Sequence, residues 1–310
     1  MLTIGRSRQY VLTEEKRPAF GFRFLQPTMT MPNQESSFVQ QLRDTRGLLG
    51  AWCTFASFAS TEVMAELGFD FLVMDMQHCE LTQAQFPAFL GAFRKARPTP
   101  VVRVPQNDYH IINWLLDQGV PAVLVPMVNS VEAAQAAVDA AKFPPVGKRS
   151  FGPYRAARYS FGVTEYMPRA DEMATLIVQI ESEEAARNID TILGVPGIDA
   201  IFMGPNDLAF SMLRPGQSFF GAQGASKGAE GASQWTGFAR TPEVLALCED
   251  VLRKCKRAGK PFGMTSSSIE EAREWLDKGA SLMTFGSDFL FIRAGAKHLM
   301  QPLNQRAEAK

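Results

Sequence analysis

The sequence predicts a (β/α)8 barrel of the α/β class, and three observations support this prediction. Short apolar, β-rich segments alternate with helical segments eight times, which is the pattern of a barrel of about 250 residues. The strand segments are mostly apolar throughout, as is typical of a parallel sheet buried on both faces. A doubly wound open sheet would usually carry a glycine-rich phosphate turn after its first strand, and this chain has none there.

Each strand is a short run rich in aliphatic and aromatic residues. The strands are expected at residues 48–56, 69–76, 100–105, 122–128, 175–181, 199–204, 262–266 and 281–286. Helices are expected between them at residues 61–68, 82–96, 108–119, 130–141, 182–193, 241–259, 268–279 and 289–300. Asp108 and Ser130 stand at expected helix N-caps and Gly119 at an expected C-cap, so these helix ends carry the clearest signals.

The domain organisation follows from where this alternation begins and where it is interrupted. Residues 1–45 show no sustained period and are expected to form an N-terminal extension. The catalytic barrel domain is expected over residues 46–305, with a short tail at 306–310. Residues 214–240 are rich in glycine and serine, and a loop of this length predicts either a lid or disorder. This insert follows the sixth strand.

Composition and charge exclude several classes of function. The chain has 310 residues, 46% of them hydrophobic, and its 32 basic residues balance 32 acidic ones. With no net charge to attract a nucleic acid or an anionic membrane, we expect neither as a partner. The longest apolar stretch, residues 120–128, is far shorter than the ~20 residues of a membrane span. The four cysteines form no CxxC pair, which favours reduced thiols and a cytoplasmic location, with organelle targeting by the extension as the alternative.

Polar residues at the ends of five strands are expected to converge on one rim, because the loops after the strands build the active sites of such barrels. The candidates are Trp52, Asp75, His78, Arg103, Gln179, Glu181, Asn206 and Asp207. Two carboxylates on adjacent strand ends, Glu181 and Asp207, can hold a hard divalent cation such as Mg²⁺ or Mn²⁺ and leave positions open for substrate. The alternative is that Glu181 merely lies near a helix N-terminus and that Asp207 is an N-cap.

Two further candidates lie on the second and third strands. Arg103 ends an apolar strand, where its guanidinium needs an anionic partner: a carboxylate substrate, the ligand carboxylates or a structural salt bridge. His78 is one of three histidines and is either an acid/base or an ordinary half-buried side chain. Asp75, three residues earlier, can pair with His78 only if the chain turns between them.

The stretches GFDFLVMDMQH, PVVRVPQND, VQIE and GPNDL identify a family. From about Leu48 to about Leu299 the chain resembles the metal-dependent class II pyruvate aldolases typified by 4-hydroxy-2-oxoheptanedioate aldolase, and it is similar to the fungal relative macrophomate synthase. The VQIE and GPNDL stretches at this spacing are the most specific. One residue departs from the family pattern, because Gln77 stands where the family usually has Glu.

The resemblance implies a role for each candidate residue. Glu181 and Asp207 would hold the metal, Mg²⁺ or Mn²⁺ with Co²⁺ as a further option. Arg103 would bind the carboxylate–enolate end of pyruvate. The remaining pocket residues would be Gln179, Pro205, Asn206 and the wall residue Trp52, with His78 paired to Asp75 as an acid/base acting through water. Family members usually form hexamers, trimers of dimers that exchange the C-terminal helix, here 289–300.

The implied reaction is reversible retro-aldol cleavage of a 4-hydroxy-2-oxo acid to pyruvate and an aldehyde through a metal-bound enolate. An alternative uses the same enolate: oxaloacetate loses CO₂ and the enolate attacks another electrophile, as in macrophomate synthase. A third hypothesis, from another class, is a barrel that binds a 2-oxo acid or a protein partner without turnover. The presence of Glu181, Asp207, Arg103 and His78 together speaks against it.

Overall fold

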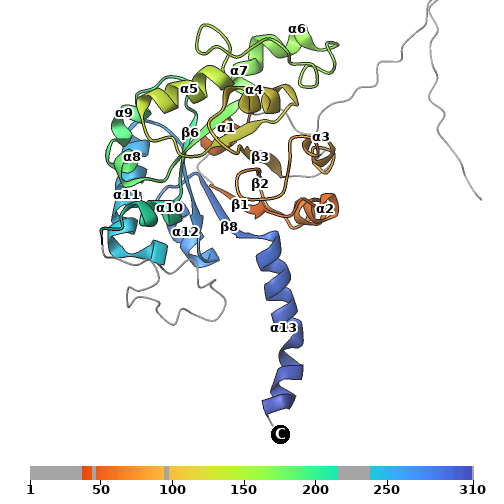
Figure 1. The fold of residues 1–310 in the computed structure, drawn as a ribbon, viewed down its shortest axis with the longest axis vertical. Coiled ribbons are helices and arrows are strands. Elements are labelled where there is room, and N and C mark those ends of the chain that lie inside the picture. The colour runs from red at the N-terminus through yellow and green to blue at the C-terminus, as the bar shows by residue number, and fades with distance from the viewer. Residues whose placement is uncertain (1–36, 44–46, 94–97, 216–237, 309–310) are drawn as a thin grey trace, which may run out of the picture. The chain divides into compact units, whose positions relative to one another are not determined.

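Eight parallel strands close into a barrel in chain order in the computed structural model, which describes residues 37–43, 47–93, 98–215 and 238–308 (Figure 1). The strands are β1 (Leu48–Cys53), β2 (Phe71–Asp75), β3 (Thr99–Arg103), β4 (Ala122–Val125), β5 (Thr175–Ile180), β6 (Ala200–Met203), β7 (Phe262–Ser266) and β8 (Leu282–Ser287). All eight lie where the sequence predicts them, and β8 pairs with β1 to close the sheet. The predicted (β/α)8 barrel is therefore confirmed.

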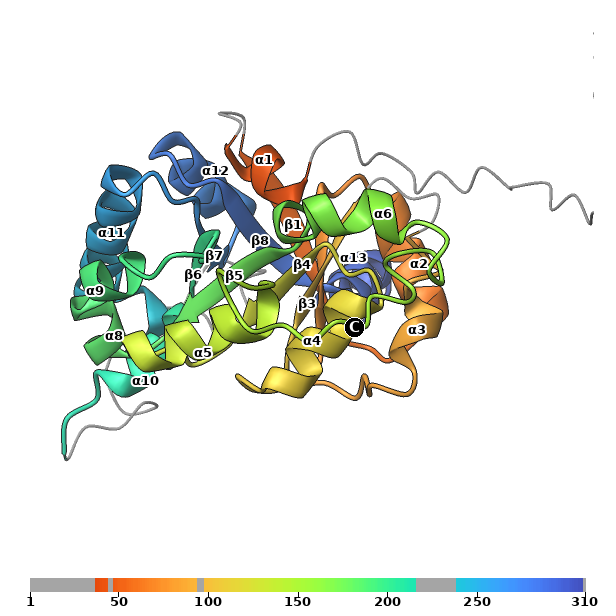
Figure 2. The same ribbon diagram turned by 90° about the horizontal axis from the view of Figure 1, so that it is seen from above.

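Helices surround the strands, as the view from above shows (Figure 2). They are α2 (Phe58–Glu66), α3 (Phe86–Phe89), α4 (Tyr109–Asp117), α5 (Val131–Ala141), α8 (Glu183–Arg187), α9 (Ile189–Leu193), α10 (Pro205–Ser211), α11 (Pro242–Arg257), α12 (Ile269–Asp277) and α13 (Asp288–Glu308). The predicted caps form: Asp108 accepts from the backbone N–H groups of His110 and Ile111, and Ser130 accepts from that of Ala133. Among the described helices, none is long and apolar enough to cross a membrane.

Three predicted helices are wrong in extent, and one of them, predicted at 289–300, runs from Asp288 to Glu308 as α13. The helix predicted at 82–96 is reduced to α3, and turns follow it up to residue 93; residues 94–97 lie outside the described part. Pro87 has no N–H to donate, and Gly91 is a poor helix former, so this segment lacks the means to continue a helix. The helix predicted at 182–193 is two short helices that meet at Asn188, whose backbone leaves the helical region.

Several short elements were not predicted. Residues 163–173 carry α6 (Val163–Tyr166), a 3₁₀ turn (Met167–Arg169) and α7 (Ala170–Met173) ahead of β5. A second 3₁₀ turn, Phe238–Arg240, precedes α11, whereas residues 216–237 of the predicted insert lie outside the described residues. These elements are only three or four residues long, which is too short for a helical period to show in the sequence.

The barrel interior is filled from its amino-terminal end. Helix α1 (Phe38–Arg43), in the described part of the predicted N-terminal extension, buries Phe38 and Leu42 against the inward-facing side chains of the strands. The ring of Phe38 lies 5.8 Å from that of Phe71, and the backbone N–H of Val39 donates to the Thr175 hydroxyl at 3.1 Å. Because α1 and this apolar layer occupy one end of the barrel, the polar residues gather at the other end.

Candidate active site

The predicted site residues lie at the carboxyl ends of neighbouring strands. Trp52 lies on β1, and Asp75 and Arg103 end β2 and β3, where the two residues stand in register. Gln179 lies on β5 and Glu181 directly follows it. Pro205, Asn206 and Asp207 open α10, immediately after β6. The barrel therefore brings candidates from five strands to one rim, as expected from their positions in the sequence.

Asp75 and Arg103 form a buried, two-pronged ion pair. Arg103 Nε donates to Asp75 Oδ1 at 2.8 Å, and Nη2 donates to Oδ2 at 2.6 Å. The same carboxylate accepts from the backbone N–H of Gln77 at 3.0 Å and from the Cys79 thiol at 3.3 Å. Burial acts to raise the pKa of Asp75, but the hydrogen bonds and the charge of Arg103 outweigh it and hold that pKa below its usual value. Arg103 thus has the anionic partner that its buried position requires.

Trp52 covers the face of the same guanidinium. The centre of the Arg103 guanidinium lies 4.4 Å from the centroid of the Trp52 ring, a cation–π distance. The indole N–H of Trp52 donates to the Thr284 hydroxyl at 2.9 Å, and Thr284 in turn contacts the Thr265 hydroxyl at 3.0 Å. On its other side the indole meets Phe202 edge to face. These contacts hold the Trp52 ring against the Arg103 guanidinium.

Glu181 is the most strongly perturbed carboxylate of the rim. Its side chain is buried; Oε1 accepts from the backbone N–H of Met127 at 2.7 Å, and Oε2 accepts from the Gln179 amide at 2.6 Å. Met127 has a positive φ of 55°, which aims its N–H at the carboxylate although the residue is not glycine. Burial raises the pKa of Glu181 to about 7, the Met127 N–H opposes this, the charge of Asp207 adds to it and that of Arg103 opposes it.

Asp207 lies in the first turn of α10, which begins directly after β6 at Pro205. Its carboxylate is exposed at the rim, as is the neighbouring Asn206. The chain reaches this position through Gly204, where an added Cβ would come within 2.7 Å of Glu181 Oε2. The absence of a side chain at 204 therefore leaves the space in which the Glu181 carboxylate lies. Pro205, the first residue of this turn, is buried.

The two acidic side chains fit a hard divalent cation. They offer only oxygen donors, and the effect of the Asp207 charge on Glu181 shows that the two negative charges act on each other, which a cation would relieve. Among the described residues, no group of three or more His, Cys, Asp or Glu side chains is arranged to hold a metal. A cation at this rim would rest on these two carboxylates and leave its other positions to water and substrate.

His78 is not joined to Asp75. Within the described part of the chain, the hydrogen bonds of Asp75 go to Arg103, Gln77 and Cys79, and the His78 side chain is exposed on the loop that follows β2. The chain does turn after β2, but the turn delivers the backbone N–H of Gln77 and the thiol of Cys79 to Asp75. The amide oxygen of Gln77 is buried and lacks a hydrogen-bond partner among the described residues.

Two residues contribute contacts that the sequence reasoning did not assign. Cys79 belongs to no sequence motif, and nothing in the sequence indicates that its thiol reaches Asp75. Met127 was taken for strand, and a positive φ at a methionine has no sequence signal. Both contacts arise where a strand ends and the chain changes direction, which is the part of a barrel that periodicity describes least well.

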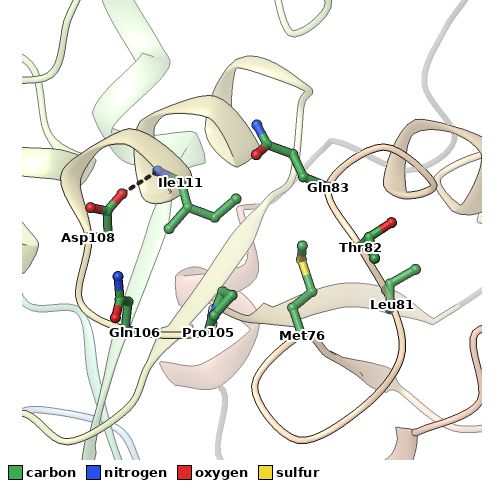
Figure 3. A pocket seen from close by; sticks show the side chains of 8 residues that line it. All are labelled: Met76, Leu81, Thr82, Gln83, Pro105, Gln106, Asp108 and Ile111. Carbon is green, nitrogen blue, oxygen red and sulfur yellow. Dashed lines mark hydrogen bonds between the residues drawn. The ribbon is translucent and has the colours of Figure 1, made fainter.

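A cavity of about 250 Å³ lies beside this rim, between the loops that follow β2 and β3 (Figure 3). Met76, Pro105 and Ile111 contribute its apolar surface, and Gln83 and Asp108 are among its polar residues. Met76 follows Asp75 directly and packs in the outer core between sheet and helices. The cavity therefore lies outside the barrel wall, behind the strand that carries Asp75, and contains none of the predicted site residues.

Comparison with known proteins identifies the family. The family model described as HpcH/HpaI aldolase/citrate lyase matches residues 48–294. The 5-keto-4-deoxy-D-glucarate aldolase of Enterobacter sp. (strain 638) is 35% identical over 251 residues, which cover 81% of this chain and 90% of that protein. The 4-hydroxy-2-oxo-heptane-1,7-dioate aldolase of Klebsiella pneumoniae subsp. pneumoniae is 33% identical over 266 residues, 85% of this chain and 92% of that protein.

Macrophomate synthase shares the fold. Its crystal structure matches with a TM-score of 0.73 at 22% identity, over 88% of this chain and 91% of that one. The family model and the sequence relatives confirm the family expected from the sequence, and macrophomate synthase is a structural neighbour. The matched region also coincides with the barrel, since it begins at β1 and ends in α13. The chain belongs to the HpcH/HpaI aldolase/citrate lyase family and is a carbon–carbon lyase of the aldolase type.

Proposed function

We propose that this chain catalyses the reversible, divalent-metal-dependent cleavage of a 4-hydroxy-2-oxo acid to pyruvate and an aldehyde. The observation that carries the proposal is the placement of Glu181 and Asp207 at the same rim as the Arg103 guanidinium. An anionic pair that can hold a cation, next to a fixed cationic group, is suited to a substrate with adjacent keto and carboxylate oxygens. The names of the relatives, which are aldolases, support this class of substrate.

Glu181 and Asp207 would hold the cation, Mg²⁺ or Mn²⁺, with Co²⁺ as a further option. When bound, such an ion supplies Lewis-acid stabilisation to the negative charge that develops as the carbon–carbon bond breaks. The Met127 N–H and the Gln179 amide each donate to one oxygen of Glu181 and hold its carboxylate in place. Such supporting hydrogen bonds commonly orient metal ligands.

Arg103 would bind the carboxylate end of the 2-oxo acid and stabilise the enolate charge. Its Nε and Nη2 are taken by Asp75, and Nη1 has no hydrogen-bond partner among the described residues. The Trp52 ring on the guanidinium face excludes water from that side. A donor held rigidly before the substrate arrives costs no reorganisation during the reaction, and this preorganisation is the main source of electrostatic catalysis. Gln179, Pro205 and Asn206 would complete the pyruvate pocket.

His78 would move the proton of the aldol hydroxyl through a water molecule. Its side chain is exposed at the rim. The Asp75 carboxylate is occupied by Arg103, so His78 has to act without the carboxylate partner that the resemblance implies. This arrangement also favours the second candidate, oxaloacetate decarboxylation followed by coupling of the enolate, because loss of CO₂ requires less of a general base.

Two incubations with Mn²⁺ test the proposal and separate the candidates. In the first incubation, with a 4-hydroxy-2-oxo acid as the only substrate, we expect pyruvate to form. If pyruvate forms only in the second incubation, with oxaloacetate as the only substrate, the result would favour the decarboxylase.

Asp207→Ala should abolish both Mn²⁺ binding, measured by calorimetry, and turnover. Asp139→Ala, which removes a carboxylate paired with Lys148 away from the rim, is the matched control and should leave both intact. Mn²⁺ binding unchanged in Asp207→Ala would contradict the assigned metal site.

We further infer that the protein is a cytoplasmic homo-oligomer, a hexamer built as a trimer of dimers, whose partner is the small 2-oxo acid rather than nucleic acid or membrane. Support for the oligomer comes from α13, which extends beyond the barrel in Figure 1. Phe291 near its start packs against Phe69 and Phe285, but Ile292 and Leu299 are 60% and 79% exposed. Exposed aliphatic side chains on a projecting helix are typical of an exchanged element.

A further inference from the structure

The Cys79 thiol contacts the catalytic rim, yet the proposed reaction gives it no task. Its sulfur lies 3.3 Å from Asp75 Oδ2, the oxygen that also accepts from Arg103 Nη2 at 2.6 Å. Cys79 is partly exposed, unlike the other three cysteines, which are buried. It lies on the loop after β2, two residues beyond Gln77, whose backbone N–H donates to the other oxygen of Asp75.

The four donors around Asp75 divide into two pairs with different effects. Arg103 supplies one donor to each carboxylate oxygen, and the loop supplies the other two, through the Gln77 N–H and the Cys79 S–H. The arginine donors move with the guanidinium and cannot fix its position by themselves. The two loop donors are anchored to the chain, so they determine where the carboxylate lies and, through it, the plane of the guanidinium.

The thiol remains a donor under the conditions in which the enzyme works. Burial and the neighbouring Asp75 charge raise the pKa of Cys79 to about 12, so its proton is retained at neutral pH. A thiol is a weaker donor than a hydroxyl, but here its acceptor is a buried carboxylate, and hydrogen bonds to charged groups are stronger than neutral ones. The guanidinium is then confined at its edge by Asp75 and on its face by Trp52.

We propose that Cys79 is a positioning residue, whose S–H holds the Asp75 carboxylate so that the free edge of Arg103 is aligned to receive the carboxylate of the 2-oxo acid. The inference rests on the proposed function for the identity of the substrate, but the link from Cys79 to Arg103 is a property of the protein alone. Because Arg103 would hold the substrate carboxylate in the ground state and also stabilise the enolate charge in the transition state, misalignment should raise KM and lower kcat.

Kinetics of paired variants give the first test. We expect Cys79→Ala to lower kcat/KM for the 2-oxo acid about three- to tenfold, through a higher KM and a lower kcat, and Cys79→Ser, which keeps a donor, to restore most of kcat/KM. In an Arg103→Lys background, which lacks the two-pronged pair, Cys79→Ala should add little. The control is Cys248→Ala, the same substitution at a buried cysteine of α11, and it should leave KM unchanged. A KM unaltered by Cys79→Ala, or raised equally in both backgrounds, overturns the proposal.

A measurement without substrate separates this inference from the proposed function. In ¹⁵N-labelled protein the Arg103 Nε–H, assigned by its loss in Arg103→Lys, should exchange slowly with solvent because it is held by Asp75. We expect exchange to be at least about fivefold faster in Cys79→Ala and near the original rate in Cys79→Ser. Equal rates in all three proteins would overturn the positioning role, even if the enzyme turns over. Failure of the enzyme to cleave any 2-oxo acid, with the exchange difference present, would overturn the proposed substrate and leave the role of Cys79 supported.

Discussion

Asp75 and Glu181 are both buried carboxylates at one rim, yet their pKa values are shifted in opposite directions. Burial acts to raise both, but Asp75 has a guanidinium in direct contact, which outweighs the burial. At Glu181 burial prevails over the neutral donors, and with the charge of Asp207 added it raises the pKa to about 7. From this difference we expect Asp75 to stay ionised and hold Arg103, and Glu181 to exchange a proton for the proposed metal ion.

Metal affinity should therefore depend on pH. Below the Glu181 pKa of about 7 the carboxyl is protonated in the metal-free protein, and the cation must displace that proton. We expect the Kd for Mn²⁺ to rise about tenfold for each pH unit below 7 and to level off above it. Calorimetric titration of metal-free protein from about pH 5.5 to about pH 8 measures this. Glu181→Gln should bind weakly with little pH dependence, and a wild-type Kd that is constant across the range would contradict the assignment.

At the scale of elements, the helix ends predicted from sequence are among the features that the structure bears out most directly. Asp108 is the N-cap of α4, and its Oδ1 accepts from the backbone N–H groups of His110 and Ile111 at 2.9 and 3.0 Å (Figure 3 draws the second bond). An N-cap side chain accepts hydrogen bonds from the backbone N–H groups of the first turn, which have no partner within the helix. The sequence signal of a helix start is therefore local and can be recognised from a single residue. α3, in contrast, depends on how a proline-containing loop packs, and its prediction was wrong in length.

Removing the α4 cap should cost stability without touching the chemistry. We expect Asp108→Ala to lower the free energy of unfolding by about 1 kcal/mol, because two backbone N–H groups lose their acceptor. Asp108→Asn keeps an acceptor oxygen and should lose clearly less. Denaturant unfolding of the two variants beside the wild type measures the difference, and turnover should remain near the wild-type level in both. An alanine variant as stable as the wild type would show that water replaces the cap at no cost.

For the whole molecule, the sequence predicts the barrel and which residues reach the rim, because both follow from periodicity and from the rule that strand ends converge. It does not predict which rim residues touch. From the sequence, Asp75 could pair with either His78 or Arg103. Only the register of β2 against β3 in the closed sheet places Arg103 opposite Asp75. The role of α1 was also missed, since a six-residue helix within a long aperiodic stretch carries no signal that it fills the barrel's amino-terminal end.

The exposed side chains of α13 lead to a prediction for the assembled molecule. One chain has a mass of 34.2 kDa, and we expect light scattering coupled to size exclusion to give a multiple of it for the wild type. Replacing Ile292 and Leu299 together by Glu should shift the protein toward the single-chain mass, because burying two carboxylates in an interface is strongly unfavourable. Lys297→Glu, a charge change at another exposed position of α13, is the control and should leave the assembly intact. A wild type that runs as a single chain, or a double variant that assembles as before, would show that α13 does not join the copies, and the proposed hexamer would then need another contact.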